Sequence, residues 1–450
     1  MPEKIVLAGH YYNPLRESNH SRFKGICTDP QGLDWTGIIA EQSYTPQARK
    51  GVFKKTSFDF QGALECALAD KYPETVAEIR VNMATRGVAD AYIHPLLPDL
   101  SRVDKQIVIG AGIKRFFDIT GKNPRFIWLP EAAVDTETLE VLIKNGIEGF
   151  ICAPNQVVLN DGSDPNNVPT RIKPPSGETI LALTYDQALS HKLAFEDDKD
   201  HPLRDDAYKF RDLVIRPALD RLRNGFPLMG YTDGETFGHH MQWGGDFIDT
   251  LINRALPEAG IEPISINEID FNKVTIAEGR IWDRSAWSCL HGDLARWHGK
   301  CDCCGGAEVG WKEPFNKAFN FLNDRITKII EGELGSSYIE KMIANFDQAF
   351  KNPGPPATTP ELSLISSKVS ALTALTSCAT FFGDPHVSGR INILHARVAV
   401  EHLKDAGLPN RARALWSTFL SSMEQVWDPT NPGKTGRDMT EKLLRDRSYC

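Results

Sequence analysis

Short apolar runs recur along residues 1–270, and each has the length and the aromatic or branched side chains that are typical of a buried strand. Helical periodicity lies between several of these runs. Buried strands that alternate with helices predict a parallel sheet covered by helices. The predicted strands are Ile5–Gly9, Ala89–Ile93, Arg125–Leu129, Gly149–Ala153, Thr179–Tyr185, Pro227–Tyr231 and Glu262–Ile266.

Two helical patterns lie between these strands. The first is marked by apolar residues at Leu64, Ala67, Leu68, Val76 and Ile79. The second runs from Val134 to Lys144, with Asp135 as its expected N-cap, an acidic Glu137 in its first turn and Gly146 as its expected terminator.

Beyond about residue 310 the strand patterns stop and helical patterns follow one another. We therefore predict an α/β domain over residues 1–310 and a helical bundle over residues 311–450. Seven parallel strands can close as a barrel or lie as an open sheet, and the pattern leaves both open. The predicted C-terminal helices are Pro314–Glu331, Ser337–Lys351, Leu362–Phe382, Val387–Ala406 and Ala412–Val426, with a loop at Asn352–Pro356.

The composition narrows the class of partner. A net charge of −8 argues against nucleic acid or an anionic membrane and suits a neutral substrate. The chain has no apolar run long enough to span a bilayer, for which about 18 residues are needed. Its first residues have no signal-peptide form, and its 9 cysteines are an odd number, so we expect reduced thiols and a cytoplasmic location.

Polar residues follow six of the seven predicted strands: His10, His94, Glu131, Asp186, Asp233 and Asn267. Any one of them is explained by a turn or a helix cap. Together they predict a site at the carboxyl ends of the strands, where parallel barrels carry their chemistry. The long connection from Tyr11 to Ser57 leaves the same rim and is expected to form a lid over it.

Two stretches place carboxylates at this rim. One is Trp128-Leu129-Pro130-Glu131, and the other runs from Asp233 to His240 with the sequence DGETFGHH. Two carboxylates that meet at one site are the machinery of glycoside hydrolysis, one as nucleophile and one as general acid/base. Glu235 is a rival acid, because in an extended segment it points to the same side as Asp233.

The chain resembles glycoside hydrolase family 57 over about its first 330 residues. The segments that resemble the family's motifs are Ala8–Pro14, Tyr92–Pro98, Trp128–Glu131 and Asp233–His240, and Trp287–Gly292 with Arg296 and Trp297 resembles a less characterised branch. The resemblance implies an incomplete seven-stranded (β/α) barrel, a helical C-terminal domain and retaining action on α-glucans. It assigns the nucleophile to Glu131 and the acid/base to Asp233.

Substrate contacts are expected around this pair. The candidate residues are His10, His94, Trp128, Glu235, His239, His240, Trp243, Trp287 and His291. The chain departs from the family's first motif, because Ala8 and Asn13 stand where the family often has a histidine and a glutamine. This departure changes the expected sugar contacts of the first subsite.

Tryptophans and cysteines concentrate in residues 282–311. Trp282, Trp287, Trp297 and Trp311 form either a core between the two domains or a wall on which sugars stack, and we expect the segment to line the cleft between the barrel and the helical domain. No metal or cofactor is expected at the catalytic pair. Candidate ligands for a structural zinc ion are Cys289, His291, Cys301, Cys303 and Cys304, with His298 nearby. The Cys-x-Cys-Cys spacing differs from the usual Cys-x2-Cys knuckle, and reduced cysteines without metal are the alternative.

Two other functions fit the same residues. A metal-dependent carbohydrate deacetylase would use His10, Asp233, His239 and His240 as donors. Bound metal near Asp233 would favour this interpretation. A non-catalytic glucan-binding protein would keep the fold without turnover, although the presence of both carboxylates opposes this hypothesis.

Overall fold

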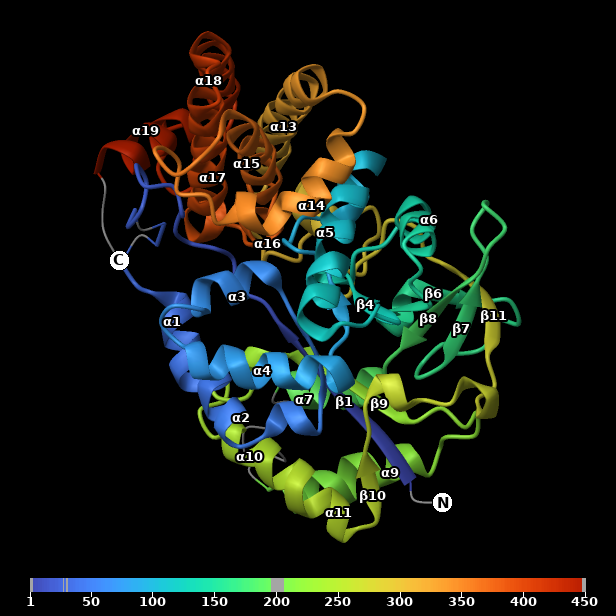
Figure 1. The fold of residues 1–450 in the computed structure, drawn as a ribbon. Helices are drawn as coiled ribbons and strands as arrows, with labels where there is room; N and C mark the ends of the chain where they lie inside the picture. Colours follow the sequence, from blue (N-terminus) through green and yellow to red (C-terminus); the bar gives the residue numbers. More distant parts are fainter. Residues whose placement is uncertain (1–2, 27, 30, 196–205, 447–450) are drawn as a thin grey trace. The chain divides into compact units, whose positions relative to one another are not determined.

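The computed structural model describes residues 3–26, 28–29, 31–195 and 206–446, which fall into two compact units (Figure 1). The barrel unit comprises Met1–Asn13, Trp35–Asp90 and Arg115–Trp287. The helical unit comprises Pro14–Asp34, Ala91–Lys114 and Ser288–Cys450. The chain thus passes between the units several times and for the last time after Trp287, whereas the sequence suggested a single boundary after residue 310.

Seven parallel strands among the described residues form the barrel. In spatial order they are β9 (Leu228–Asp233), β1 (Glu3–Tyr11), β2 (Ser57–Phe60), β3 (Ala89–Asp90), β4 (Phe126–Trp128), β5 (Gly149–Cys152) and β8 (Ile180–Thr184). A bridge between Phe58 and Gly87 links β2 to the start of β3. Between β8 and β9 the link is a hydrogen bond from the backbone N–H of Asp186 to the carbonyl of Met229. The barrel is therefore incomplete, as predicted.

Six of the seven predicted strands are barrel strands. The seventh corresponds to β10 (Ile261–Pro263), which pairs with the first residues of β1. The barrel strand that the sequence did not reveal is β2, because it has only four residues and all four are buried. The strands β7 (Pro169–Ile172), β11 (Ala277–Ile281) and β6 (Val157–Leu159) extend the sheet beyond β8.

Successive side chains along the strands point to opposite faces of the sheet, so they pack into two separate hydrophobic clusters. Val6 and Ala8 of β1 join an interior cluster with Trp128, Met229 and Tyr231. The intervening Ile5 and Leu7 join an outer cluster that includes Leu189 of α7 and Leu228 of β9. Because a strand has a period of two, the residues that follow the interior series on β1 and β9 are His10 and Asp233.

The helices of the barrel unit are short apart from α4. They are α1 (Trp35–Ile39), α2 (Thr45–Arg49), α3 (Gly62–Leu68), α4 (Pro73–Arg86), α6 (Thr136–Lys144), α7 (Gln187–Ala194), α8 (Ala207–Phe210), α9 (Arg216–Leu219), α10 (Gly244–Thr250) and α11 (Leu256–Glu258). α6 begins as predicted, since Asp135 accepts a hydrogen bond from the N–H of Thr138. Gly146 follows its end with a φ of 77°.

The helical unit is built mainly from long helices. They are α13 (Lys312–Leu334), α14 (Tyr338–Phe350), α15 (Pro360–Thr373), α17 (Pro385–Asp405), α18 (Pro409–Met423) and α19 (Gly436–Asp446), with the short α12 (Ala295–His298) and α16 (Cys378–Phe381). α5 (Arg102–Thr120) contributes its first residues to the same unit. Its core holds an ion pair, because the fully buried Lys368 lies 2.6 Å from Asp104. The predicted helix Leu362–Phe382 is interrupted after Thr373.

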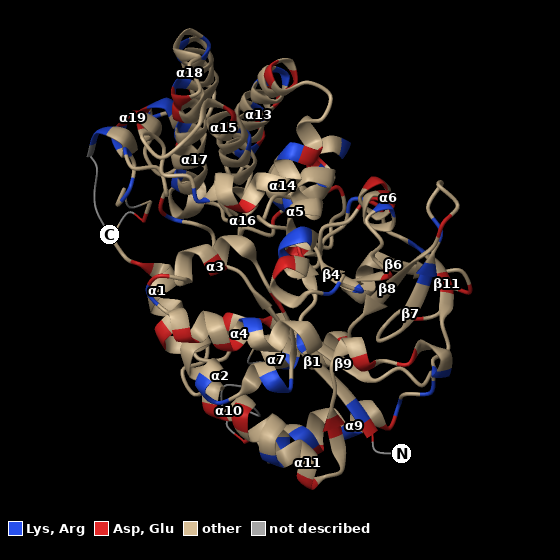
Figure 2. Ribbon diagram, viewed as in Figure 1, with Lys and Arg blue, Asp and Glu red and all other residues tan. Residues whose placement is uncertain are grey.

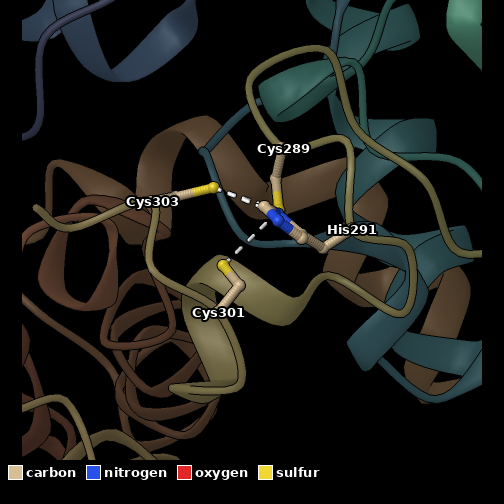
Figure 3. Close-up of side chains that lie close together, drawn as sticks. All are labelled: Cys289, His291, Cys301 and Cys303. Carbon is tan, nitrogen blue, oxygen red and sulfur yellow. Dashed lines mark hydrogen bonds between the residues drawn. The ribbon is translucent and has the colours of Figure 1, made fainter. Parts of the chain in front are cut away.

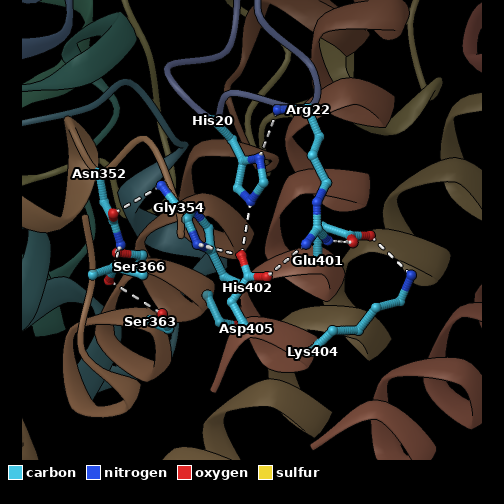
Figure 4. Close-up of polar contacts among 12 residues, drawn as sticks. His20, Arg22, Asn352, Gly354, Ser363, Ser366, Glu401, His402, Lys404 and Asp405 are labelled. Carbon is cyan, nitrogen blue, oxygen red and sulfur yellow. Dashed lines mark hydrogen bonds and ion pairs between the residues drawn. The ribbon is translucent and has the colours of Figure 1, made fainter. Parts of the chain in front are cut away.

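Within the helical unit, a polar network links His20 and Arg22 to the end of α17 (Figure 4). His20 Nε2 lies 2.9 Å from a carboxylate oxygen of Asp405, and Arg22 pairs with Glu401. Burial and the neighbouring His20 lower the pKa of His402 to about 3, so this ring is neutral. Half of the predicted lid thus belongs to the helical unit, while residues 35–54 form α1, α2 and short turns of the barrel unit.

Acidic and basic side chains are interspersed along the helices of both units (Figure 2). In the part of the chain that the structure describes, no helix combines the length and the apolar character needed to cross a membrane.

Candidate active site

Strand register brings three titratable residues to one level of the barrel. His10 of β1 pairs with Asp233 of β9 on one side and with Asp59 of β2 on the other. Paired residues of neighbouring parallel strands point to the same face, and for β1 and β9 this face is the barrel interior. The three side chains therefore converge at the carboxyl ends of their strands.

Asp59 holds the His10 ring in place. Nδ1 of His10 donates to Oδ2 of Asp59 at 2.6 Å, and the Tyr231 hydroxyl donates to Oδ1 at 2.5 Å. The Asp59 side chain has no solvent exposure. A buried carboxylate that accepts from both neighbours orients the imidazole and favours its protonated form.

Glu131 lies on a strained turn directly after β4. Its φ of 57° and ψ of 19° are in the left-handed region, and Ala132 follows with a φ of 46°. Residues with side chains rarely adopt this conformation, which is found at functional sites whose surroundings hold it. Here the backbone N–H of Trp287 donates to the Glu131 carbonyl at 3.2 Å, and Trp287 Nε1 donates to the Glu131 carboxylate at 3.4 Å.

The pKa of Asp233 is raised to about 7. Burial of the carboxyl group is the largest cause, and the charges of Glu235 and Glu131 raise the pKa further, while His10 and His240 oppose the shift. The carboxyl groups of Glu131 and Asp233 are thus close enough to interact. Near neutral pH, Asp233 can therefore supply a proton.

His10 faces the same carboxylates. Burial alone would lower the pKa of His10, but Asp59 outweighs it, and Asp233 and Glu131 add to the effect, so the pKa is raised. The protonated form of the imidazole is therefore favoured by the three acidic groups around it. Its positive charge would offset part of the negative charge of the site.

Aromatic rings pack against His10 and against one another next to these titratable residues. The ring of Tyr231 stacks on Trp128 with centroids 4.1 Å apart, and Trp128 meets Trp287 edge to face at 4.9 Å. Trp128 is fully buried, and its ring lies 5.5 Å from that of His10. Trp128 therefore contacts both Trp287 and His10 from a buried position, and its predicted contribution to substrate binding stays a prediction.

The chain turns sharply after Asp233. The strand ends there and a 3₁₀ turn, Gly234–Thr236, follows, so Glu235 does not lie on the extended segment that would point it to the same side as Asp233. A Cβ on Gly234 would lie 2.4 Å from the Tyr11 ring, which explains the glycine. The carbonyls of Gly234 and Phe237 accept hydrogen bonds from the buried Gln47 side chain.

Glu235 has partners of its own. Its carboxylate accepts from the Tyr44 hydroxyl at 3.5 Å and lies 3.2 Å from His240 Nε2. His239 contacts Gln42 at 2.7 Å instead. The two histidines therefore lie on the segment after Asp233 with different partners.

Trp243 is 44% exposed and lies at the start of α10, where its ring is available to a ligand. Asp186 caps α7, and the Asn267 side chain donates to the carbonyl of Gly87, so both serve as turn or cap residues. His94 and His291 belong to the helical unit, and their predicted contribution to substrate binding stays a prediction. The His94 carbonyl accepts from the backbone N–H of Ser377.

Sequence reasoning missed Asp59 and the role of Tyr231. The signal for Asp59 was a carboxylate between two phenylalanines, Phe58 and Phe60, in a segment too short for its alternation to stand out. Tyr231 lay inside a predicted strand, where only its apolar ring was considered. Both residues act through contacts with distant parts of the chain.

A group of potential metal donors also lies here. In the described residues, His10, Asp59 and Asp90 are buried and place donor atoms within 4.8 Å of one another. This group differs from the predicted set of His10, Asp233, His239 and His240. His10 Nδ1 and Asp59 Oδ2 are joined by a short hydrogen bond, so these two atoms are already used and could not bind a metal ion while the bond is kept.

The fold is an incomplete parallel barrel with acidic side chains at the carboxyl ends of its strands, and comparison of the sequence gives the family. The model of glycosyl hydrolase family 57 matches residues 29–277. The chain therefore belongs to glycosyl hydrolase family 57, and the predicted family and enzyme class are confirmed. A search of curated proteins gave no match.

Solved structures confirm the architecture. The exo-type maltose-forming amylase of Pyrococcus sp. ST04 superposes with a TM-score of 0.71 at 16% identity, over 94% of this chain and 83% of that one. The family 57 branching enzyme of Pyrococcus horikoshii gives 0.64 at 15% identity, over 100% and 95%. The 4-α-glucanotransferase of Thermococcus litoralis gives 0.54 at 15%, over 83% and 60%. At this identity the likeness shows the shared fold.

Proposed function

We propose that the enzyme cleaves or transfers glycosidic bonds of α-glucans by retaining double displacement, with Glu131 as nucleophile and Asp233 as general acid/base. The observation that carries the proposal is the Asp233 carboxyl group, whose pKa is raised to about 7 beside Glu131. A retaining mechanism needs one carboxyl group protonated and the other ionised. It also needs the two groups about 5–5.5 Å apart when substrate is bound.

The charge of Glu131 contributes to both roles of Asp233, although burial is the largest cause of its raised pKa. In the free enzyme this charge helps to keep Asp233 protonated, so that it can donate to the leaving oxygen. When Glu131 forms an ester with the sugar, its charge is lost and the pKa of Asp233 falls. Asp233 then accepts a proton from water or from a sugar hydroxyl, and the product keeps the configuration of the substrate.

The surrounding residues orient these two groups. Trp287 donates to the Glu131 carboxylate and is expected to hold it toward the anomeric carbon. His10, fixed by Asp59, is expected to donate to a sugar hydroxyl. The exposed ring of Trp243 offers an apolar surface on which a sugar can stack.

The substrate class rests on the structural neighbours, which are an amylase, a branching enzyme and a glucanotransferase. We include a cytoplasmic location in the proposal, because the cysteines of the described residues form no disulfide with one another and reducing compartments keep cysteines in this state.

The proposal predicts that the wild-type chain turns over maltooligosaccharides with retention. Incubation with maltoheptaose should give shorter or longer α-glucans, and proton NMR during the first turnovers should show the α-anomer before mutarotation. Transfer products would indicate that a sugar hydroxyl intercepts the intermediate, and glucose or maltose alone would indicate hydrolysis. Release of the β-anomer, or no turnover across a panel of α-linked oligosaccharides, would overturn the proposal.

The pH profile tests which carboxyl group is the acid. Because Asp233 must be protonated and its pKa is about 7, kcat/KM should fall about tenfold per pH unit above neutrality. Glu235→Gln removes a charge that raises this pKa, so the basic limb should move to lower pH while activity on the acid side persists. Glu148→Gln, which alters an exposed ion pair with Arg125, is the matched control and should leave the limb in place. Loss of activity at every pH in the Glu235 variant would make Glu235 the acid instead.

A metal-dependent deacetylase is a second candidate, because His10, Asp59 and Asp90 form a buried donor group. The two functions release different products. Acetate from acetylated oligosaccharides would favour the deacetylase, and new reducing ends from unmodified glucans would favour the glycosidase. Binding of glucan without either product would identify a non-catalytic member of the family.

A further inference from the structure

Three thiols and one imidazole converge in the helical unit (Figure 3). Cys289 and His291 precede the short helix α12, and Cys301 and Cys303 follow it. Sγ of Cys289 lies 3.9 Å from Sγ of Cys301, 3.9 Å from Sγ of Cys303 and 3.7 Å from Nδ1 of His291. Sγ of Cys303 lies 3.3 Å from the same nitrogen.

These separations match the edges of a zinc tetrahedron. Bonds of about 2.3 Å to sulfur and about 2.0 Å to nitrogen place sulfur atoms about 3.8 Å apart, and sulfur and nitrogen about 3.5 Å apart. All four donor atoms lie within 4.8 Å of one another, so the remaining edges are also compatible with a single ion. The donors thus surround a point at which a zinc ion fits.

We propose that Cys289, His291, Cys301 and Cys303 bind a structural zinc ion. Four protein ligands close the tetrahedron and leave no position for water or substrate, which distinguishes a structural site from a catalytic one. The site belongs to the helical unit and is independent of the proposed glycosidase chemistry.

The structure separates these four residues from the other candidates. The Cys304 thiol contacts Lys312 Nζ at 3.1 Å and the carbonyl of Phe381 at 3.5 Å. His298 Nε2 lies 2.8 Å from Asp99. Neither belongs to the convergent group, so Cys304 provides a matched control one residue away from a ligand.

The surrounding segment has little regular structure of its own. Among the described residues 288–311, the regular helix is the short α12. Just before it, Asp293 and Leu294 have left-handed backbone conformations, with φ of 44° and 50°. Trp297 and Trp311, which lie within and at the end of this segment, are fully buried. A metal that joins both sides of α12 would fix these turns, as structural zinc does in small folds.

A disulfide explains the group less well. The Cys289 sulfur is equally far from Cys301 and Cys303, and both distances exceed the bonded length of about 2.05 Å. A bond to one would leave the other thiol and His291 without a reason to converge. Zinc accounts for all four donors at once.

The test is metal analysis of the full chain, purified under reducing conditions without chelator and then equilibrated with zinc. Mass spectrometry of the desalted protein should give about one zinc ion per chain. Cys303→Ser and His291→Ala should reduce the content to below about a tenth, whereas Cys304→Ser should keep it. Cobalt added to metal-free wild-type protein should give the charge-transfer and intense visible bands of tetrahedral thiolate coordination.

Two results would overturn the proposal. One is wild-type protein that holds no zinc after equilibration while its cysteines react as free thiols. The other is a Cys304→Ser variant that loses zinc as fully as Cys303→Ser. The cobalt spectrum keeps the test valid if a variant fails to fold, because it is recorded on the wild-type chain, and none of these readouts depends on glycosidase activity.

Discussion

Glu131→Gln is expected to reduce kcat on maltooligosaccharides by about 10⁴-fold, which is roughly 5.5 kcal/mol in the barrier. An amide keeps the shape of the carboxylate but cannot attack the anomeric carbon, so the glycosyl-enzyme does not form. The Trp287 indole can still donate to the amide oxygen, because glutamine has the same length as glutamate. The substitution leaves the backbone of the strained turn unchanged. Binding measured by calorimetry should therefore persist while turnover is lost.

The matched control is Glu148→Gln, which removes a carboxylate of the same size from an exposed pair with Arg125. Exposed pairs contribute about 0–1 kcal/mol, so this variant should keep wild-type kinetics. A Glu131 variant with kcat within tenfold of wild type would exclude it as the nucleophile. Loss of binding together with turnover would instead point to a role in holding the substrate.

Most of the barrel could be predicted from local pattern, because its strands are short apolar runs at nearly regular intervals. The period of two along β1 also determined which of its residues face inward, and so where His10 would point. β2 could not be recognised in the same way. Its four residues are all buried, so Ser57 and Asp59 occupy positions where a pattern search expects apolar side chains.

The contacts that organise the site are not local. His10 and Asp59 are 49 positions apart, and Trp287 and Glu131 are 156 apart. Hydrophobic periodicity reports which face of an element is buried, but it carries no record of which distant side chain lies opposite. The raised pKa of Asp233 depends on burial and on residues that are distant in the sequence. A retaining mechanism requires such a raised pKa, but the sequence around Asp233 does not by itself indicate it.

The cysteine segment shows the same limit. Five candidate ligands were evident along the chain, and their spacing did not match a known knuckle. The fold selects four of them, because α12 turns the chain so that Cys289 and Cys303 face one another while Cys304 points to Lys312. Adjacent residues in a turn can point in opposite directions, which spacing alone cannot reveal.

Asp233→Asn is expected to lower kcat/KM on natural α-glucans by about 10²–10⁴-fold, because a sugar leaving group needs a proton in the first step. An activated aryl α-glucoside needs little acid help, so its first step should proceed at nearly the wild-type rate. The second step then lacks a base, and the glycosyl-enzyme should accumulate on Glu131. Intact-protein mass spectrometry after mixing would detect this adduct, and Asp212→Asn, which alters an exposed ion pair with Arg211, should show none.

Azide gives the sharpest separation of the two carboxylates. With Asp233→Asn, azide needs no base and attacks the glycosyl-enzyme, so the product should be the α-glucosyl azide. With Glu131→Ala there is no covalent intermediate, and azide in the space of the missing side chain should attack the substrate directly and give the β-glucosyl azide. The same azide anomer from both variants would contradict the assigned roles. Activity of both variants within about tenfold of wild type, roughly 1.4 kcal/mol, would show that the catalytic pair lies elsewhere.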